Sequence, residues 1–209
     1  MSNAFVAGAT LLALLGCNLL TPVIFIGEHK KRVLPEFDKL AGSRVAVLVW
    51  TDPSTLFDYP YARLELATYV AGKLEADMTQ RGHDIDVVDP RRVEALVEKN
   101  LHARIDPRAV GEAFDADYVI YLEVIRFQIR DPQQPQFLRG ELEASVSVHD
   151  MHAEPDEVRR FDLTPVHCLY PEGSPILMST VNAAAVREAT YRKFAEQVAR
   201  KFYAYTVDL

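Results

Sequence analysis

The chain has 209 residues, of which 49% are hydrophobic and 25% are charged, an ordinary balance for a globular protein. Its formal net charge of -7 argues against a nucleic-acid-binding protein, because such proteins present a basic face. It contains two cysteines, Cys17 and Cys168, so a disulfide framework is excluded once the role of Cys17 described below is considered. Cys168 is expected to be a small buried hydrophobe.

An uncharged apolar run begins at Phe5 and ends in the sequence LLGC, residues Leu14–Cys17. An apolar core of about 7–15 residues that ends in small residues is typical of a secretory signal. The motif resembles a bacterial lipobox. In the lipoproteins that it resembles, the cysteine takes a diacylglycerol, the chain is cut before it and the new amine is acylated. The resemblance implies a signal peptide over residues 1–16 and lipidation of Cys17.

A second interpretation of this segment is a retained transmembrane helix. Residues Ala4–Ile26 carry no charge, and a membrane span needs about 20 apolar residues. The basic residues Lys30, Lys31 and Arg32 would then tend to hold the following domain in the cytoplasm. The sequence alone leaves both interpretations open.

Residues 17–38 are predicted to be a lipid anchor and tether. The apolar stretch Asn18–Ile26 would lie against lipid or the domain, and the basic cluster His29–Arg32 would lie near headgroups. In the lipoproteins that the motif resembles, an Asp after the acylated cysteine commonly retains the protein at the inner membrane. Asn18 is not that signal, so the resemblance implies the periplasmic face of the outer membrane rather than the inner membrane.

The first half of the domain alternates strands and helices. Arg44–Trp50 is an almost continuous apolar run of β-branched residues, which predicts a central strand covered on both faces. Leu, Val and Met recur at every fourth position over a helix from about Tyr61 to Arg81, and His83–Val88 follows as a second strand. Two short helices are predicted after Asp89-Pro90 and Asp106-Pro107, because Asp caps a helix and Pro suits its first position.

Between the first strand and the first helix, Thr51–Tyr61 is predicted to be a loop rich in aromatic residues. The loop contains Phe57, Tyr59 and Tyr61, and Trp50 directly precedes it. If these rings are exposed, they form a partner-binding loop, because aromatic residues dominate binding energy at interfaces. The alternative is that they fasten the loop to the core.

The sequence pattern of the second half predicts an antiparallel sheet and a long helix. Glu141–Asp150 alternates between apolar and polar residues, and Val158–Tyr170 holds a further strand interrupted by Pro165. An apolar stripe predicts a long helix over Val181–Tyr205. The predicted fold is therefore a single α/β (α+β) domain over residues 39–209, with a mixed sheet of about five strands, helices packed on it and a long C-terminal helix.

Three motifs taken together resemble a known α/β domain. They are the strand Arg44–Trp50, the strand-to-helix junction DVVDPRRV at 86–93, and ADYVI at Ala116–Ile120. The resemblance, over roughly residues 44–150, is to the small domain shared by the curli-secretion lipoprotein, the lipoprotein activators of penicillin-binding proteins and the N-terminal domain of the Tol periplasmic protein. It implies a structural, capping place for Asp117 at the helix-to-strand turn.

The candidates for chemistry are few. His149 and His152 are spaced for a helix but follow a predicted strand, so their rings need not converge on a metal. Glu141 and Glu143 would lie about 7 Å apart on one strand face, where the alternation already explains them as solvated residues. Phosphate-binding loops and nucleophile elbows are absent from the sequence. We therefore expect no enzyme activity, cofactor or metal.

The preferred hypothesis is a membrane-anchored, non-enzymatic lipoprotein of the bacterial cell envelope that binds membrane lipid through Cys17. Its domain would bind a protein partner in envelope assembly or secretion. One alternative is a small-ligand-binding or hydrolytic domain, with Thr51–Tyr61 covering a pocket at the carboxyl end of the strand Arg44–Trp50. The other is a cytoplasmic domain behind an N-terminal transmembrane helix.

Overall fold

A computed structural model describes residues 30–99, 105–131, 133–152 and 159–208. The chain divides into two compact units, one of which is the α/β domain Leu34–Ala204. The other unit joins the two ends of the chain, where β1 (Lys30–Val33) pairs antiparallel with β8 (Tyr205–Asp208). A strand inside the predicted tether was not anticipated, because four residues carry no strand signal without the partner that pairs with them.

The α/β domain is built on a mixed sheet, as predicted. Its strand order is β3-β2-β4-β5-β6, with β7 paired to β5 outside this path. The strand β2 pairs parallel with β3 and β4, whereas β4, β5 and β6 pair antiparallel with one another. The strands are β2 (Arg44–Trp50), β3 (Asp86–Val87), β4 (Tyr118–Arg130), β5 (Phe137–Asp150), β6 (Arg159–Tyr170) and β7 (Ile176–Leu177).

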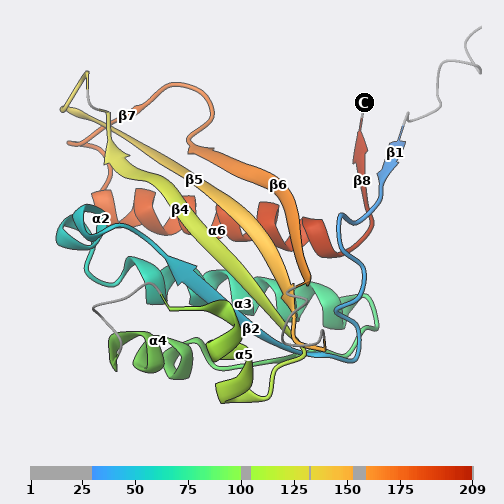
Figure 1. Cartoon of the computed structure of the whole chain (residues 1–209). Helices are drawn as coiled ribbons and strands as arrows, with labels where there is room; N and C mark the ends of the chain where they lie inside the picture. The colour runs from blue at the N-terminus through green and yellow to red at the C-terminus, as the bar shows by residue number, and fades with distance from the viewer. Residues whose placement is uncertain (1–29, 100–104, 132, 153–158, 209) are drawn as a thin grey trace, which may run out of the picture. The chain divides into compact units, whose positions relative to one another are not determined.

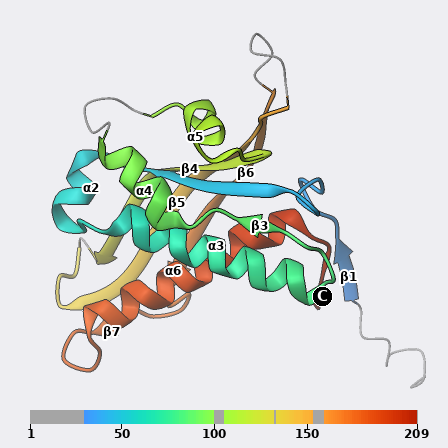
Figure 2. The same cartoon turned by 90° about the horizontal axis from the view of Figure 1, so that it is seen from below.

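Helices cover both faces of the sheet (Figures 1 and 2). The two long helices α3 and α6 lie side by side on one face, and α4 and α5 pack on the other face of β2 and β4. The helices are α2 (Pro53–Asp58), α3 (Ala62–Gln80), α4 (Pro90–Lys99), α5 (Pro107–Phe114) and α6 (Ala183–Ala199), followed by the 3-10 turn η1 (Arg200–Phe202).

The strand β2 is the centre of the core. Its residues from Val45 to Val49 are all buried, which confirms the prediction of a strand covered on both faces. On one face, Ala46 and Leu48 pack against the apolar residues of α4 and α5. Burying one such aliphatic side chain contributes about 1.5–3 kcal/mol, so a polar substitution within β2 would destabilise both layers.

The second face depends on the close approach of α6 to β5. Gly140 of β5 lies directly beneath Thr190 of α6, and a Cβ at this position would collide with the Thr190 side chain. Cys168 of β6 is fully buried nearby, as expected, and its Sγ lies 3.7 Å from the Thr190 carbonyl oxygen. Burial raises the pKa of the Cys168 thiol to about 11, so this thiol is protonated and unreactive at neutral pH.

The local signals for helix starts were correct. Asp89 and Asp106 each accept a hydrogen bond from the backbone N–H two residues further on, at 2.9 Å and 3.0 Å. A proline follows each Asp at the first helical position, where it presets φ for the helix.

Three predicted boundaries were wrong. The second strand spans only Asp86–Val87, because only Arg44 and Val45 of β2 pair with it. The predicted loop Thr51–Tyr61 contains the helix α2. The C-terminal helix ends at Ala199 rather than near Tyr205. The apolar stripe does not mark this end, because it continues to Phe202, which is also buried.

Candidate functional site

The helix α2 lies at the carboxyl end of β2, and the segment from this helix to Tyr61 presents two aromatic rings to solvent. Its N-cap Asp52 accepts hydrogen bonds from the backbone N–H groups of Ser54 at 2.8 Å and Thr55 at 3.2 Å. No residue of α2 is buried. Phe57 is 88% exposed, and Tyr61, just beyond the helix, is 71% exposed. Folding therefore leaves two large aromatic rings uncovered in one short segment.

The other two residues of the predicted partner-binding set pack inward. The Tyr59 ring lies 4.6 Å from the Phe127 ring, measured between centroids, and Trp50 packs against the cluster beneath α4 and α5. Tyr59 thus fastens the segment to the core, whereas Phe57 and Tyr61 are exposed to solvent.

A small apolar cavity lies under α2, lined among others by Thr51 and Tyr191. Its volume is about 10 Å³, which is enough for one water molecule and too small for a metabolite. The Thr51 and Tyr191 side-chain hydroxyls are buried without a hydrogen-bond partner in the described part of the chain. This cavity therefore cannot hold the ligand that the alternative hypothesis of a small-ligand-binding domain requires.

A larger hollow, which we call the α2–α6 groove, opens beside α2. It has a volume of about 540 Å³. Its walls come from three segments that are far apart in the sequence: Asp58 and Tyr59 at the end of α2, Arg130 at the end of β4, and Ala184 and Arg187 of α6. A second hollow of about 450 Å³ continues between α3 and α6 and shares Ala184 and Arg187.

Two arginines set the charge of the α2–α6 groove. The Nε of Arg187 lies 3.5 Å from Glu65, and about a third of each side chain is exposed. Arg130 makes no ion pair with any residue that the structure describes. Burial raises the pKa of the Tyr59 hydroxyl and the Asp58 carboxylate acts in the same direction, whereas a backbone hydrogen bond at Ile129 and the charges of Arg130 and Arg187 lower it.

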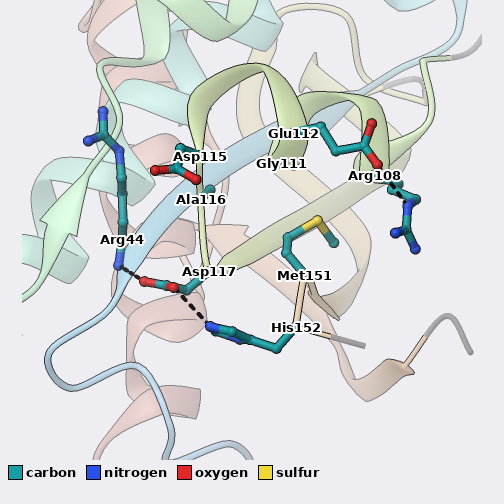
Figure 3. Close-up of a pocket in the computed structure, with 9 residues that line it drawn as sticks. All are labelled: Arg44, Arg108, Gly111, Glu112, Asp115, Ala116, Asp117, Met151 and His152. Carbon is teal, nitrogen blue, oxygen red and sulfur yellow. Dashed lines mark hydrogen bonds and ion pairs between the residues drawn. The ribbon is translucent and has the colours of Figure 1, made fainter. Parts of the chain in front are cut away.

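At the amino end of β2 lies a different hollow, a cleft of about 410 Å³ (Figure 3). Asp117 is its centre. One carboxylate oxygen accepts a 2.6 Å hydrogen bond from the Arg44 backbone N–H, and the other lies 3.0 Å from Nε2 of His152. The Nδ1 of His152 lies 3.2 Å from Asp150. Asp117 thus joins β2 to the end of β5, which is a structural role, whereas Asp115, with a left-handed φ of 50°, is the residue that ends α5.

The two arginines of this cleft do not converge. Arg44 pairs with Asp86 at 3.4 Å and Arg108 with Glu112 at 2.9 Å, and Figure 3 shows their side chains on opposite sides of the cleft. The lining residues include no serine, threonine or cysteine that could act as a nucleophile. The Arg44 and Arg108 guanidinium groups each contact a neighbouring carboxylate, and the Arg44 Nε is buried without a hydrogen-bond partner in the described part of the chain.

The two histidines considered as metal ligands lie in different surroundings. His149 is 7% exposed, and its Nε2 lies 3.3 Å from Ser147 Oγ, whereas His152 is exposed in the cleft of Figure 3. Within the described ranges, no group of three or more His, Cys, Asp or Glu side chains is arranged to hold a metal ion.

The two glutamates considered as an acid/base pair lie on a polar face of the sheet. Glu141 accepts a 2.6 Å hydrogen bond from Gln128 and lies 3.2 Å from His167 and 3.5 Å from Arg126. Glu143 lies opposite Arg126 in the neighbouring strand. Neighbouring side chains thus engage Glu141 on this face, which favours the interpretation of these glutamates as surface residues.

Cys17 and the apolar segment around it lie outside the described residues, so the structure does not address the predicted anchor. No helix among the residues that the structure does describe has the length and apolar character needed to cross a membrane.

No protein-family model and no curated protein matches this sequence. Several solved structures align with this chain at low scores. The PelC dodecamer from Paraburkholderia phytofirmans aligns with a TM-score of 0.43 and 12% identity, covering 81% of this chain and 96% of that one. The hypothetical protein CT253 from Chlamydia trachomatis aligns with a TM-score of 0.41 and 11% identity, covering 77% and 98%. Lipoprotein GNA1162 from Neisseria meningitidis aligns with a TM-score of 0.36 and 14% identity, covering 63% and 81%. Scores this low assign neither a family nor a function to the chain.

Proposed function

We propose that this chain is a membrane-anchored, non-enzymatic lipoprotein whose α/β domain binds a protein partner through α2. The observation that carries the proposal is the exposure of Phe57, at 88%, and Tyr61, at 71%. Large aromatic rings are usually covered in a folded chain, and at interfaces they are enriched among the residues that dominate binding.

The anchor in this proposal is Cys17, on the strength of the LLGC motif and the apolar run before it. Acylated there, the protein would be held in the bacterial cell envelope on the periplasmic side. Asn18 after the cysteine favours the outer membrane over the inner one. The partner would then be a protein of envelope assembly or secretion.

The proposal that the protein is not an enzyme is supported by the hydrogen bonds and ion pairs of its polar side chains. The cleft at the amino end of β2 pairs its arginines and Asp117 within the fold, and Glu141 is likewise engaged by its neighbours. The described lining of that cleft includes no serine, threonine or cysteine that could act as a nucleophile beside Asp117 and His152.

The anchor is tested by replacing Cys17 with serine in the full chain. We expect the Cys17→Ser protein to lose its lipid, keep its signal segment uncut and lose function, and we expect a signal-peptidase II inhibitor to block processing of the wild-type protein. Mass spectrometry of the membrane fraction measures both effects. If the Cys17→Ser protein is fully active and no processing step is sensitive to the inhibitor, the retained transmembrane helix replaces the lipoprotein.

The partner surface is tested by the double variant Phe57→Ala/Tyr61→Ala, compared with Ile125→Ala. Ile125 is a matched control because it is also a large exposed apolar residue, at 57%, but belongs to β4. Pull-down of the acylated proteins from membranes should show partner recovery reduced by about tenfold or more for the double variant, since hot-spot rings contribute about 2 kcal/mol or more. Equal recovery by the double variant and the control, with unchanged folding, would reject α2 as the surface.

A further inference from the structure

The α2–α6 groove lies beside the exposed rings of α2. Figures 1 and 2 both place α2, the end of β4 and the start of α6 at the same end of the sheet. The groove is lined by Asp58 and Tyr59, the residues that directly follow Phe57. A partner that covers Phe57 is therefore positioned to enter the groove as well.

The lining of the groove has an excess of one positive charge, although the whole chain carries a net charge of -7. Arg130 and Arg187 line it against a single carboxylate, that of Asp58. The 17-residue helix α6 also begins here, and its first turn contains no acidic residue that would offset the positive end of the helix dipole. Arg130 lacks an ion pair among the described residues, and Arg187 has only the 3.5 Å contact with Glu65.

A register shift in the sheet lies at the same place. The pairing of β4 with β5 shifts between Gln128 and Arg130, so that Arg130 lies opposite Leu138. Such irregularities are frequent beside binding sites, because they change where a side chain points.

The inner wall of the groove is aromatic. The Tyr59 and Phe127 rings are in contact, and Phe127 stacks on the buried Tyr191 ring with 5.2 Å between centroids. A preformed wall of this kind offers an apolar contact at little cost in conformational entropy.

From these observations we infer that the α2–α6 groove binds an acidic peptide segment of the partner, with one or more Asp or Glu side chains reaching Arg130 and Arg187. An apolar side chain of the same segment would lie against Tyr59 and Phe127. Charge complementarity selects the occupant, because an acidic segment is the peptide chemistry that two arginines and a helix N-terminus favour. The inference rests on the proposed function and names the chemistry of the partner at that surface.

A polyphosphate or nucleic-acid occupant fits less well. Asp58 lies in the wall, and the net charge of -7 opposes the approach of a long polyanion. A short acidic peptide presents fewer charges and adds the apolar contact that the aromatic wall accommodates.

The first experiment maps the groove in the acylated full-length protein. A photoreactive benzoylphenylalanine replaces Phe57, and cross-linked partner is quantified in membranes with and without the change Arg130→Gln/Arg187→Gln. Arg126→Gln is the matched control, because Arg126 is also an exposed β4 arginine, which pairs with Glu141 at 3.5 Å and does not line the groove. We expect the double variant to lose about tenfold or more of the adduct and the control to retain it, since close interfacial charge pairs have effects of this size.

The second experiment identifies the occupant. Mass spectrometry locates the cross-linked partner segment, which is then synthesised with its own Asp and Glu residues and, separately, with Asn and Gln in their place. We expect the acidic peptide to bind the wild-type protein at least about tenfold more tightly than the neutral peptide, with an affinity that falls at high salt. The Arg187→Glu variant should prefer a peptide in which Lys replaces the acidic residues.

Three outcomes separate the two proposals. If the adduct forms but is insensitive to both arginine changes, or the captured segment is not acidic, the groove inference is wrong and the partner surface stands. If the captured molecule is a nucleic acid or a lipid, the groove inference also fails. If no adduct forms at Phe57, the proposed function fails first. Arg130→Gln alone serves if the double variant unfolds, because Arg130 has no ion pair to lose within the described chain.

Discussion

The two ends of the central strand β2 carry hollows of similar size, about 410 Å³ at the amino end and about 540 Å³ beside α2 at the carboxyl end. At the amino end, Asp117 accepts the Arg44 backbone N–H and contacts His152, and the arginines there have carboxylate partners. At the carboxyl end, Arg130 has no ion pair among the described residues, and Phe57 is 88% exposed.

The difference shows that the volume of a hollow does not indicate its role. Polar groups that find partners within the chain brace the fold, because removing one partner leaves the other without its hydrogen bond. Groups that the fold leaves without partners remain available to another molecule. The amino end is therefore expected to respond to mutation through stability, and the α2 end through binding.

The largest effect on stability is expected from Asp117→Ala. The change removes the acceptor of the Arg44 backbone N–H and the contact with His152, so the free energy of unfolding should fall by about 1–2 kcal/mol. About a third of the Asp117 side chain is exposed, which lets water replace part of the loss. Urea denaturation measures the change.

Asp117→Asn is the matched control for this prediction, because its amide oxygen can still accept the Arg44 N–H. It should therefore lose less stability than Asp117→Ala. Cross-linking at Phe57 should be unchanged in both variants as long as they are folded. Loss of the adduct in folded Asp117→Ala would break the distinction between the two ends.

A smaller effect is expected from the buried His149, close to the amino end. Burial lowers the pKa of His149 below its usual 6.5, and Arg160 opposite it in β6 acts in the same direction. Because the unfolded chain binds this proton more readily, stability is complete above about pH 6.5 and falls as the pH is lowered through that value. His149→Gln should flatten this part of the curve of unfolding free energy against pH, measured by denaturation between pH 7.5 and about pH 5.5. An identical slope in wild type and variant would show that His149 is not responsible.

The smallest effect on global stability is expected from Asp52→Ala at the α2 end. Loss of an N-cap usually costs about 1 kcal/mol, but α2 has no buried residue, so the cost should appear as local opening of the helix. Global unfolding should change by less than about 0.5 kcal/mol. Hydrogen exchange of the Ser54 and Thr55 amides should accelerate, since Asp52 is their acceptor. A global loss as large as that of Asp117→Ala would show that α2 is part of the core.

The helix α2 and the groove beside it show what a local sequence signal can and cannot predict. Asp52-Pro53 repeats the signal of Asp89-Pro90 and Asp106-Pro107, and this signal was present in the sequence before the structure showed the helix. The segment was nevertheless predicted to be a loop, because several aromatic residues follow this signal. By contrast, nothing in the sequence near Arg130 or Arg187 indicates that these residues line one groove, because they are 57 positions apart.

The sequence by itself determined the elements whose signals are local: the apolar strand Arg44–Trp50, the capped helices α4 and α5, and the alternating strand β5. It also contains the LLGC motif at Leu14–Cys17 on which the predicted anchor rests. Only the tertiary structure decided which aromatic rings of the α2 segment are covered and which arginines meet beside it. Burial and charge pairing depend on contacts between distant segments, and a short window of sequence does not encode those contacts.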